Sequence, residues 1–208
     1  MSAVFIFDMD GVIADSWKPL YTSLCNLLHD LDQQALCNEQ SIKALFEDNF
    51  MAGLKKALAP SEVSSQALMK LAVEINQSTQ DTPCFDHITP VLQRLHTLFP
   101  LYLVTSNFTD SAQRFLKKHQ LEVFQGIFGL DHHPSKVTKI RQLAKQYPNH
   151  TLYYIGDTLG DIREAQEAGV SSIAACWGWH DESLLKKGKP DHLIHHPKHL
   201  LDIADRHR

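Results

Sequence analysis

The chain has 208 residues, of which 43% are hydrophobic and 21% are charged, and its formal net charge is −4. This composition is typical of a globular protein and excludes a disordered chain, while the weak acidic charge speaks against nucleic acid as a partner. No apolar run is long enough to span a bilayer, and the N-terminus lacks a signal-peptide pattern, so we expect no membrane partner either.

The first predicted strand spans residues 4–7 and is apolar throughout. Between residues 15 and 85, apolar residues recur at helical spacing and no strand pattern stands out, which predicts a run of helices. The positions that mark their buried faces are Leu20, Leu24, Leu27, Leu28, Leu31, Ile42, Leu45, Phe46, Leu54, Val63, Leu71 and Ile75, with Ser61 as the N-cap of the last helix.

Beyond residue 85, strand patterns alternate with helical patterns. The predicted strands span residues 101–104, 151–155, 172–176 and, more weakly, 192–194. One helix is predicted to begin with Thr89 as its N-cap and Pro90 in its first turn. This alternation predicts an α/β fold with a parallel sheet covered by helices. We place the core domain at residues 1–14 and 86–208 and a helical insert at residues 15–85.

Two acids, Asp8 and Asp10, stand at the end of the first strand in the stretch VFIFDMDGV, and Gly11 permits a tight turn after them. Open parallel sheets bind ligands at the carboxyl ends of their strands. Two buried carboxylates disfavour each other's charge, so one can stay ionised as a nucleophile while the other keeps a proton to donate. A turn with two solvated aspartates is the alternative that this motif alone leaves open.

Other predicted strand ends and one helix start bring further polar groups to the same edge of the sheet. The stretches LYLVTSN, HHPSKVTKI and LYYIGDTLGDI supply Thr105, Ser106, Asn107, Lys136, Asp157 and Asp161. Several carboxylates without histidine or cysteine suit a hard cation such as Mg²⁺. A lysine and a hydroxyl suit phosphoryl oxygens.

The motifs DMDGV, LVTSN, SK and GDTLGD, in this order between residues 8 and 161, resemble those of the haloacid dehalogenase superfamily. The similarity is to its phosphoglycolate-phosphatase-like branch, whose members carry a helical C1-type cap. The resemblance implies a Rossmann-like, doubly wound parallel sheet, with the insert as a small all-helical cap after the first strand. It also implies a Mg²⁺-dependent phosphatase that hydrolyses a small phosphomonoester through an aspartyl-phosphate intermediate.

By this resemblance, Asp8 would attack phosphorus, and Asp10 would act as general acid and then as general base. Mg²⁺ would be bound by the Asp8 carboxylate, the main-chain carbonyl of Asp10 and Asp157. Asp161 would support the metal-bound waters or the lysine. The alternative for Asp161 is an acid that stabilises the dipole of its helix.

The resemblance also assigns the residues that would bind substrate. Thr105 and Lys136 would bind phosphoryl oxygens, and the lysine would balance the nucleophile's charge. Main-chain N–H groups near Ser106 and Asn107 would assist. Lys139 competes with Lys136 for its role, but the helix phase puts Lys139 on a face that we expect outside.

The predicted insert contains nine acids, five lysines and no arginine. A cap that clamps a second phosphate or a carboxylate would favour arginine, so this composition speaks against bisphosphates and phosphoglycolate as substrates. Lys55 and Lys56 could reach an anionic substrate, although a solvated lysine pair is the simpler interpretation.

Four cysteines, at positions 25, 37, 84 and 176, form no C-x-x-C pair. We interpret them as reduced, buried thiols, which predicts a cytoplasmic protein. The expected partner is a small phosphorylated metabolite, and the expected assembly is a monomer or a small homo-oligomer. A phosphomutase on the same scaffold and a non-catalytic binding protein stay open as alternative functions.

Overall fold

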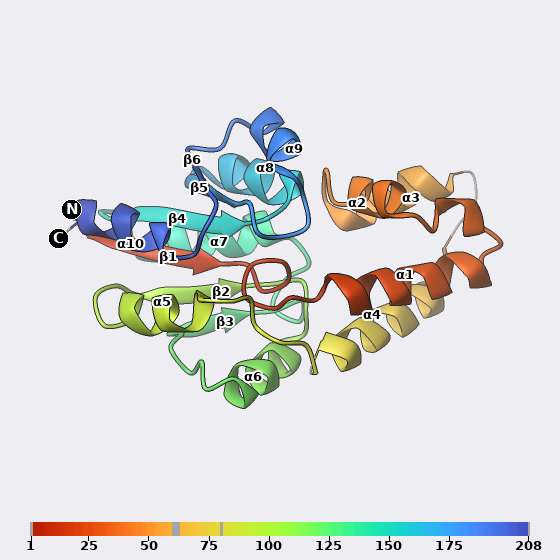
Figure 1. Cartoon of the computed structure of the whole chain (residues 1–208), viewed down its shortest axis with the longest axis horizontal. Coiled ribbons are helices and arrows are strands. Elements are labelled where there is room, and N and C mark those ends of the chain that lie inside the picture. The colour runs from red at the N-terminus through yellow and green to blue at the C-terminus, as the bar shows by residue number, and fades with distance from the viewer. Residues whose placement is uncertain (1, 60–62, 80, 208) are drawn as a thin grey trace.

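Six parallel strands form one sheet in the part of the chain that the computed structural model describes, residues 2–59, 63–79 and 81–207. The strands are β1 (Ala3–Phe7), β2 (Leu101–Val104), β3 (Gly126–Phe128), β4 (Thr151–Gly156), β5 (Ser171–Ala175) and β6 (His192–Ile194). Their order across the sheet is β3-β2-β1-β4-β5-β6, so β1 lies between β2 and β4 (Figure 1). The predicted α/β class with a parallel sheet is confirmed.

Helices cover both faces of this sheet (Figure 1). They are α5 (Ile88–Leu95), α6 (Thr109–Lys118), α7 (Lys136–Gln146), α8 (Leu159–Ala168), α9 (Glu182–Lys187) and α10 (His199–Ala204), followed by the 3₁₀ helix η2 (Asp205–His207). Successive side chains of a strand point to opposite faces. Ala3, Phe5 and Phe7 therefore pack in the core with α5, α6 and α10, whereas Val4 and Ile6 pack with α7 and α8. Burial on both faces explains why β1 is apolar at every position.

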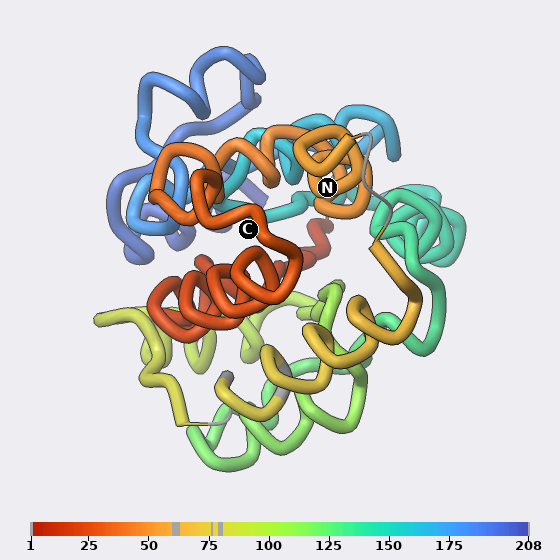
Figure 2. Tube along the Cα trace, turned by 90° about the vertical axis from the view of Figure 1, so that its right-hand side faces the viewer, coloured from red at the N-terminus to blue at the C-terminus, as the bar shows by residue number. Residues whose placement is uncertain are grey.

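Between β1 and α5 the chain forms a group of helices at one end of the sheet. They are α1 (Trp17–Asp30), the 3₁₀ helix η1 (Gln34–Leu36), α2 (Glu39–Ala44), α3 (Phe50–Leu58) and α4 (Ser65–Thr79). We call this segment the cap; its boundaries at residues 15 and 85 remain a prediction. Its helices pack around their own apolar cluster, and α1 and α4 lie side by side, with α4 close to α6 (Figure 2).

Two local predictions differ from the structure. Strand β3 was not predicted, because it has three residues, lies at the edge of the sheet and is only half-buried, so it has no long apolar pattern. Helix α5 begins at Ile88 after His87, whose φ of 65° is left-handed, so Thr89 and Pro90 lie inside the first turn. The predicted N-cap Ser61 lies outside the described residues.

The cap contains a disulfide between Cys25 on α1 and Cys37, whose Cα atoms lie 5.1 Å apart. The prediction of four reduced, buried thiols is therefore wrong. The turn after α1 and the short helix η1 bring Cys37 back against α1, which the sequence spacing does not reveal. Cys84 and Cys176 are free and half-buried. The predicted cytoplasmic location, which rested on reduced thiols, loses that support.

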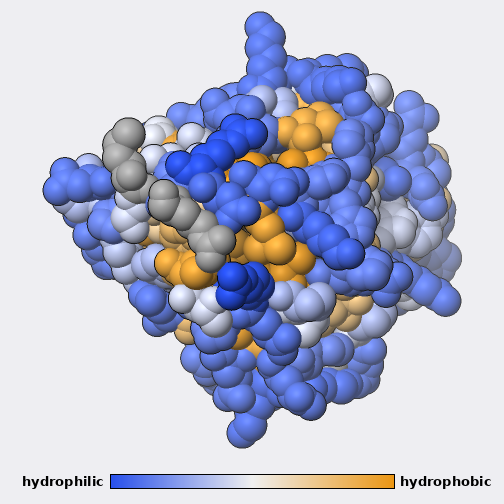
Figure 3. Space-filling view, turned by 60° about the vertical axis from the view of Figure 1, so that its left-hand side comes forward, coloured by the Kyte–Doolittle hydropathy of each residue, from blue (hydrophilic) through white to orange (hydrophobic). Residues whose placement is uncertain are grey.

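The side of the molecule that carries both termini is mostly hydrophilic, with apolar residues in patches between the polar ones (Figure 3). Among the described residues, the large apolar side chains that are exposed, Met51, Met69 and Val73, belong to the cap helices α3 and α4. None of the helices traced here over residues 2–59, 63–79 and 81–207 combines the length and apolar character needed to cross a membrane.

Candidate active site

Polar side chains gather where the carboxyl ends of three strands meet the start of α7. Strand β1 ends just before Asp8, β2 ends just before Thr105, and β4 ends just before Asp157. Lys136 is the first residue of α7, with Ser135 as its N-cap. Asp8, Thr105 and Asp157 are all buried. The groups that can bind them are therefore those that the fold of the chain brings next to them, and not solvent.

Lys136 lies between two carboxylates. Its Nζ donates to Oδ2 of Asp8 at 2.7 Å and to Oδ1 of Asp161 at 2.8 Å, and the Glu164 carboxylate lies 4.0 Å away. Burial disfavours the charge of this lysine, but Asp161 and Asp8 outweigh burial and hold its pKa well above the ordinary value. Lys136 is therefore a stable cation in direct contact with Asp8.

Asp8, Asp157 and Asp161 each offer a carboxylate oxygen within 4.8 Å of the others. Burial raises the pKa of Asp8 to about 7, with Lys136 opposing this shift, and it raises the pKa of Asp157 well above the usual range. The neighbouring charge of Asp161 adds to both shifts. One lysine does not balance three buried carboxylates, and a divalent cation would supply the missing positive charge.

Asp157 is held so that one of its oxygens stays available. Its Oδ2 accepts a hydrogen bond from the N–H of Trp179 at 2.7 Å, whereas its buried Oδ1 has no partner among the described residues. Gly11 and Gly178 flank the carboxylate so closely that a Cβ at either position would overlap with it. In the same described part of the chain, no main-chain N–H bonds the Asp10 carbonyl. Such unpaired oxygens fit the ligand preferences of a hard cation.

Asp10 is held in place by Asn107, whose Nδ2 donates to Oδ2 of Asp10 at 2.6 Å. The other oxygen, Oδ1, is buried and has no hydrogen-bond partner within the described residues. Burial raises the pKa of Asp10, while hydrogen bonds from Ser16 and Asn107 offset part of the shift. Because Oδ2 accepts from the amide, a proton on this carboxyl group belongs on Oδ1, where it can be donated.

The segment after β2 forms a short turn. Oγ1 of Thr105 accepts a hydrogen bond from the N–H of Asn107 at 3.1 Å. Thr105 and Asn107 are buried and Ser106 is exposed. For the residues that the structure describes, no main-chain hydrogen bond uses the N–H of Ser106. This turn therefore offers a hydroxyl and an unpaired N–H to an anion.

Asp161 both caps a helix and holds the lysine. It is the third residue of α8, and its Oδ2 accepts hydrogen bonds from the N–H and Oγ1 of Thr158. Its own N–H donates to Oγ1 of Thr158, which completes a capping box. Its Oδ1 accepts from Lys136 and from Tyr154. Burial alone would raise the pKa of Asp161, but Lys136, Thr158 and Tyr154 lower it overall. The two interpretations of Asp161, support for the lysine and a helix-terminal acid, are thus compatible.

Lys139 does not lie on the outer face of α7, so that prediction is wrong. It is 1% exposed, and its Nζ donates to the main-chain carbonyls of Thr105 at 2.7 Å and Gly129 at 3.1 Å. These carbonyls lie at the ends of β2 and β3, and no helical pattern reveals that they converge on α7. Contact with Asp8 comes from Lys136, one turn earlier.

The cap touches the core at the N-terminal part of α8, through the segment between α2 and α3. The carbonyl of Phe46 accepts a hydrogen bond from the N–H of Gly160 at 3.0 Å. Arg163 donates to the carbonyl of Glu47 at 2.8 Å and pairs with the carboxylate of Asp48. Most of these contacts use main-chain atoms of the cap, which explains why no side-chain motif predicts them.

His180 and Trp179, which follow β5, extend this contact. Nδ1 of His180 accepts from the N–H of Leu159 at 3.0 Å, and its Nε2 donates to the carbonyl of Lys43 at 2.9 Å. The Trp179 ring packs edge-on against Phe46, with the ring centroids 5.0 Å apart. His180 is not among the residues predicted for the site from the sequence. The available signal was its place after a predicted strand, at the same edge of the sheet as the carboxylates.

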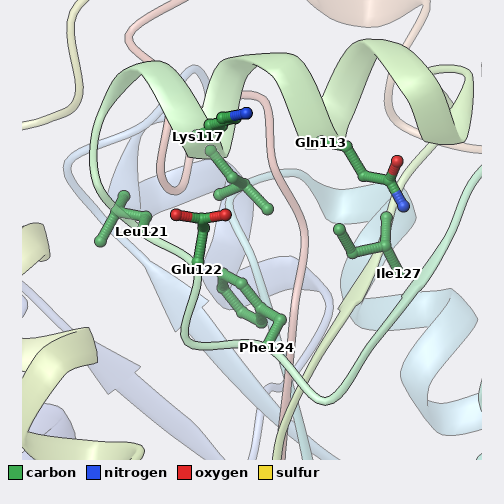
Figure 4. Close-up of a pocket in the computed structure, with 7 residues that line it drawn as sticks. Gln113, Lys117, Leu121, Glu122, Phe124 and Ile127 are labelled. Carbon is green, nitrogen blue, oxygen red and sulfur yellow. The ribbon is translucent and has the colours of Figure 1, made fainter.

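A pocket elsewhere in the molecule is separate from this site. It is lined by Gln113, Leu116, Lys117, Leu121, Glu122, Phe124 and Ile127. These side chains come from α6, from the segment that leads into β3 and, for Ile127, from β3 itself (Figure 4). None of the predicted site residues lines it, so we assign it no part in the chemistry.

Comparisons with known proteins agree with this geometry. The relative named as the pyrophosphatase PpaX, from Caldanaerobacter subterraneus, is 28% identical over 95% of this chain and 92% of that protein. A phosphoglycolate phosphatase from Aliivibrio fischeri is 24% identical over 95% and 94%. The fold matches the crystal structure of the HAD-hydrolase YfnB from Bacillus subtilis, which was solved with magnesium bound. The TM-score is 0.67 and the identity 18%, over 98% of this chain and 99% of that one.

The family assignment rests on a broader match. A model of the haloacid dehalogenase-like hydrolase family matches residues 5–175. The matched segment begins in β1 and ends at the last residue of β5, so it contains both acids after β1, the turn after β2, Lys136 and the two acids after β4. The chain therefore belongs to the haloacid dehalogenase-like hydrolases.

Proposed function

We propose that this hydrolase is a phosphatase that cleaves a small phosphomonoester in two steps, through a phosphorylated Asp8. The observation that carries the proposal is the difference between the hydrogen-bond partners of two neighbouring carboxyl groups. Asp8 contacts the cation of Lys136, which favours its ionised form. Asp10 instead accepts from a neutral amide and keeps one unpaired, buried oxygen. A nucleophile and a proton donor need this difference.

In the first step, a carboxylate oxygen of Asp8 attacks phosphorus, and the bond between phosphorus and the ester oxygen breaks. The leaving alkoxide takes the proton from Asp10. In the second step, a water molecule gives a proton back to Asp10 and attacks the same phosphorus. The bond between phosphorus and Asp8 then breaks, which releases phosphate and restores the carboxylate. Both steps conserve charge and protons without a further reactant.

The other residues bind and position the transferred group. The hydroxyl of Thr105, the N–H of Ser106 and the cation of Lys136 would contact phosphoryl oxygens, whose charge is spread over three positions in the transition state. The Asp8 and Asp157 carboxylates and the Asp10 carbonyl would hold Mg²⁺, which when bound neutralises charge on phosphate and carboxylate alike. The magnesium in the structural neighbour YfnB supports the choice of this ion.

The composition of the cap supports a proposal for the substrate class. Relatives of this chain are named for phosphoglycolate and pyrophosphate, both of which carry a second anionic group. The cap has no arginine, and Lys55 and Lys56 are exposed on α3. We therefore propose a phosphomonoester whose leaving group is uncharged, with a higher kcat/KM than phosphoglycolate or pyrophosphate.

The first test is release of p-nitrophenol from its phosphate ester, with Mg²⁺ and with EDTA. We expect metal-dependent turnover that falls roughly a thousandfold or more in Asp8→Asn, because this change removes the nucleophile. Asp110→Asn is the matched control, since Asp110 is an exposed acid on α6. Full activity of Asp8→Asn would contradict the mechanism.

A second assay separates phosphatase from mutase chemistry. Natural phosphate esters, phosphoglycolate and pyrophosphate are each supplied, and free phosphate and rearranged esters are measured. Phosphate release supports the proposal. Rearranged ester without phosphate release would show that the phosphorylated Asp8 is protected from water, as in a phosphomutase.

A further inference from the structure

Lys139 is a buried cation that the proposed reaction does not use. Its side chain is enclosed beneath the turn that follows β2, and it is bound there by two main-chain carbonyls rather than by a carboxylate. A buried lysine without an anionic partner is costly, so carbonyl groups that hold it must be oriented toward it. This arrangement suggests that Lys139 fixes the path of the main chain.

The first of these carbonyls belongs to Thr105 and determines the direction of the next N–H. The peptide unit between Thr105 and Ser106 is planar and trans, so its C=O and N–H point in opposite directions. Nζ of Lys139 binds this carbonyl oxygen at 2.7 Å, so the C=O points toward α7. The Ser106 N–H consequently points away from Lys139, and within the described residues no main-chain bond engages it.

The second carbonyl joins this turn to the end of β3. Gly129, whose carbonyl accepts from Lys139, lies against the turn so closely that a Cβ there would overlap with main-chain atoms of Thr109 and Asn107. The next residue, Leu130, donates its N–H to the carbonyl of Asn107 at 2.8 Å. Lys139 thus binds two segments that are themselves packed together.

The same turn also holds the proposed general acid. Asn107 is two residues after Thr105, donates its N–H to Oγ1 of Thr105 and reaches Asp10 with its side-chain amide. Any change in the orientation of the Thr105 carbonyl would therefore move the N–H of Ser106 and the hydrogen bond from Asn107 to Asp10 together. The charge of Lys139, one helical turn from Lys136, also adds to the positive potential behind the turn.

We propose that Lys139 is a positioning residue, which orients the turn Thr105–Ser106–Asn107 for phosphate binding and for proton donation by Asp10. This inference rests on the proposed phosphatase function. It assigns Lys139 no contact with the substrate. The titrating and charged groups around it are Lys136 on α7, Asp8 after β1, Glu164 on α8 and Asp131 before α7. Burial, together with the charge of Lys136, lowers the pKa of Lys139 to about 8, so the lysine is largely charged at neutral pH.

The test compares Lys139→Met with Leu143→Ala. Methionine keeps a flexible stem but removes the charge and the donors, whereas Leu143 is a fully buried apolar residue of the same helix that belongs to a core cluster with Ala165 of α8. Three quantities are measured for the folded protein with p-nitrophenyl phosphate: kcat, the inhibition constant of tungstate, and the melting temperature. Tungstate is a phosphate-like dianion whose own charge does not change near neutral pH.

We expect Lys139→Met to lower kcat and to weaken tungstate inhibition by about tenfold each, because two hydrogen bonds from a charged group are lost. Leu143→Ala is expected to lower the melting temperature at least as much, with both kinetic quantities within roughly twofold of the native protein. If the two variants change kinetics equally, Lys139 is merely structural and the proposal is wrong.

Two further measurements cover the other outcomes. If Lys139→Met does not fold, Lys139→Gln replaces it, because glutamine keeps a neutral donor, and a smaller loss of the same kind is expected. An unchanged tungstate constant in Lys139→Gln would overturn the proposal. If the native protein cleaves no phosphomonoester, the proposed function fails, but calorimetric binding of tungstate to the native chain and to Lys139→Met still tests the role of Lys139.

Discussion

The core and the cap of this molecule bury polar groups in very different ways. In the core, the buried carboxylates of Asp8 and Asp161, which are far apart in sequence, are linked by short hydrogen bonds from the half-buried Lys136. The cap instead has an apolar interior, in which Trp179 of the core also packs, and its main-chain carbonyls, such as those of Lys43 and Phe46, accept hydrogen bonds from the core. The proposed reaction therefore depends on side chains of the core, whereas the contribution of the cap is its shape.

This contrast predicts that small changes in the core reduce activity far more than changes of equal size in the cap. Among changes that leave the proposed reacting groups themselves intact, the largest effect is expected for Gly178→Ala, because the added Cβ would overlap with Asp157. We expect kcat/KM to fall roughly a hundredfold or more, through a displaced carboxylate and weaker metal binding. Gly169→Ala is the control: it has a positive φ of 79°, with open space around its Cβ, and lies at the far end of α8. Equal losses in both variants would mean that general destabilisation, and not displacement of the Asp157 carboxylate, explains the effect.

The next effect concerns the proton donor. In Asn107→Ala, Asp10 loses the amide that holds its Oδ2, and we expect kcat to fall roughly tenfold to a hundredfold for an alkyl phosphate. p-Nitrophenyl phosphate is the internal control, since its weakly basic leaving group needs little protonation and should be affected less. A uniform loss with both substrates would indicate that Asn107 positions the phosphate rather than the acid.

A change in the cap is expected to alter the stability of the protein rather than its catalytic rate. Replacing Cys25 by alanine removes the disulfide with Cys37, which closes a loop of sequence separation 12. A cross-link of this size contributes about 3 kcal/mol, so the melting temperature should fall while kcat on p-nitrophenyl phosphate changes less than about twofold. In the denatured protein without substitutions, titration of thiols should find two before reduction, those of Cys84 and Cys176, and four after reduction. Four thiols before reduction would contradict the disulfide.

The smallest effect lies where the two regions meet. Glu164 accepts a hydrogen bond from Asn49 of the cap, and burial raises its pKa to about 7 from an ordinary value of 4.5, with Lys136 opposing the shift. A raised pKa means that the folded state favours the protonated form. The stability that Glu164 contributes is therefore complete below pH 4.5 and is lost as the pH rises through 7.

Glu164→Gln removes this titration. We expect its melting temperature to match that of the native protein near pH 4.5 and to exceed it by a few degrees at pH 8. The same comparison at high salt is the control: the difference in melting temperature should persist there, because salt screens a buried group little. A difference of equal size at both pH values would show that packing, rather than charge, separates the two proteins.

The sequence predicted the features that depend on local pattern. Four apolar strands, a weaker fifth and the polar residues at their ends could be identified, because buried parallel strands and turn glycines leave clear signals. What it could not predict depends on tertiary contact. The three-residue edge strand β3 has too few residues for a pattern, and the position of Lys139 depends on carbonyls from two other elements. The Cys25–Cys37 bond depends on how the chain turns after α1.

The central position of β1 has a consequence for how the protein is made. Phe5 pairs with Leu101 on one side and Tyr153 on the other, so this strand has no partner until about half of the chain has been synthesised, and its second partner follows much later. The cap helices, by contrast, contact one another within one continuous stretch. During synthesis the cap can form early, while the apolar strand that precedes Asp8 keeps one edge unpaired and prone to aggregation until residue 151 has emerged. Fragments that stop before β4 would therefore be poor starting points for isolating the active centre.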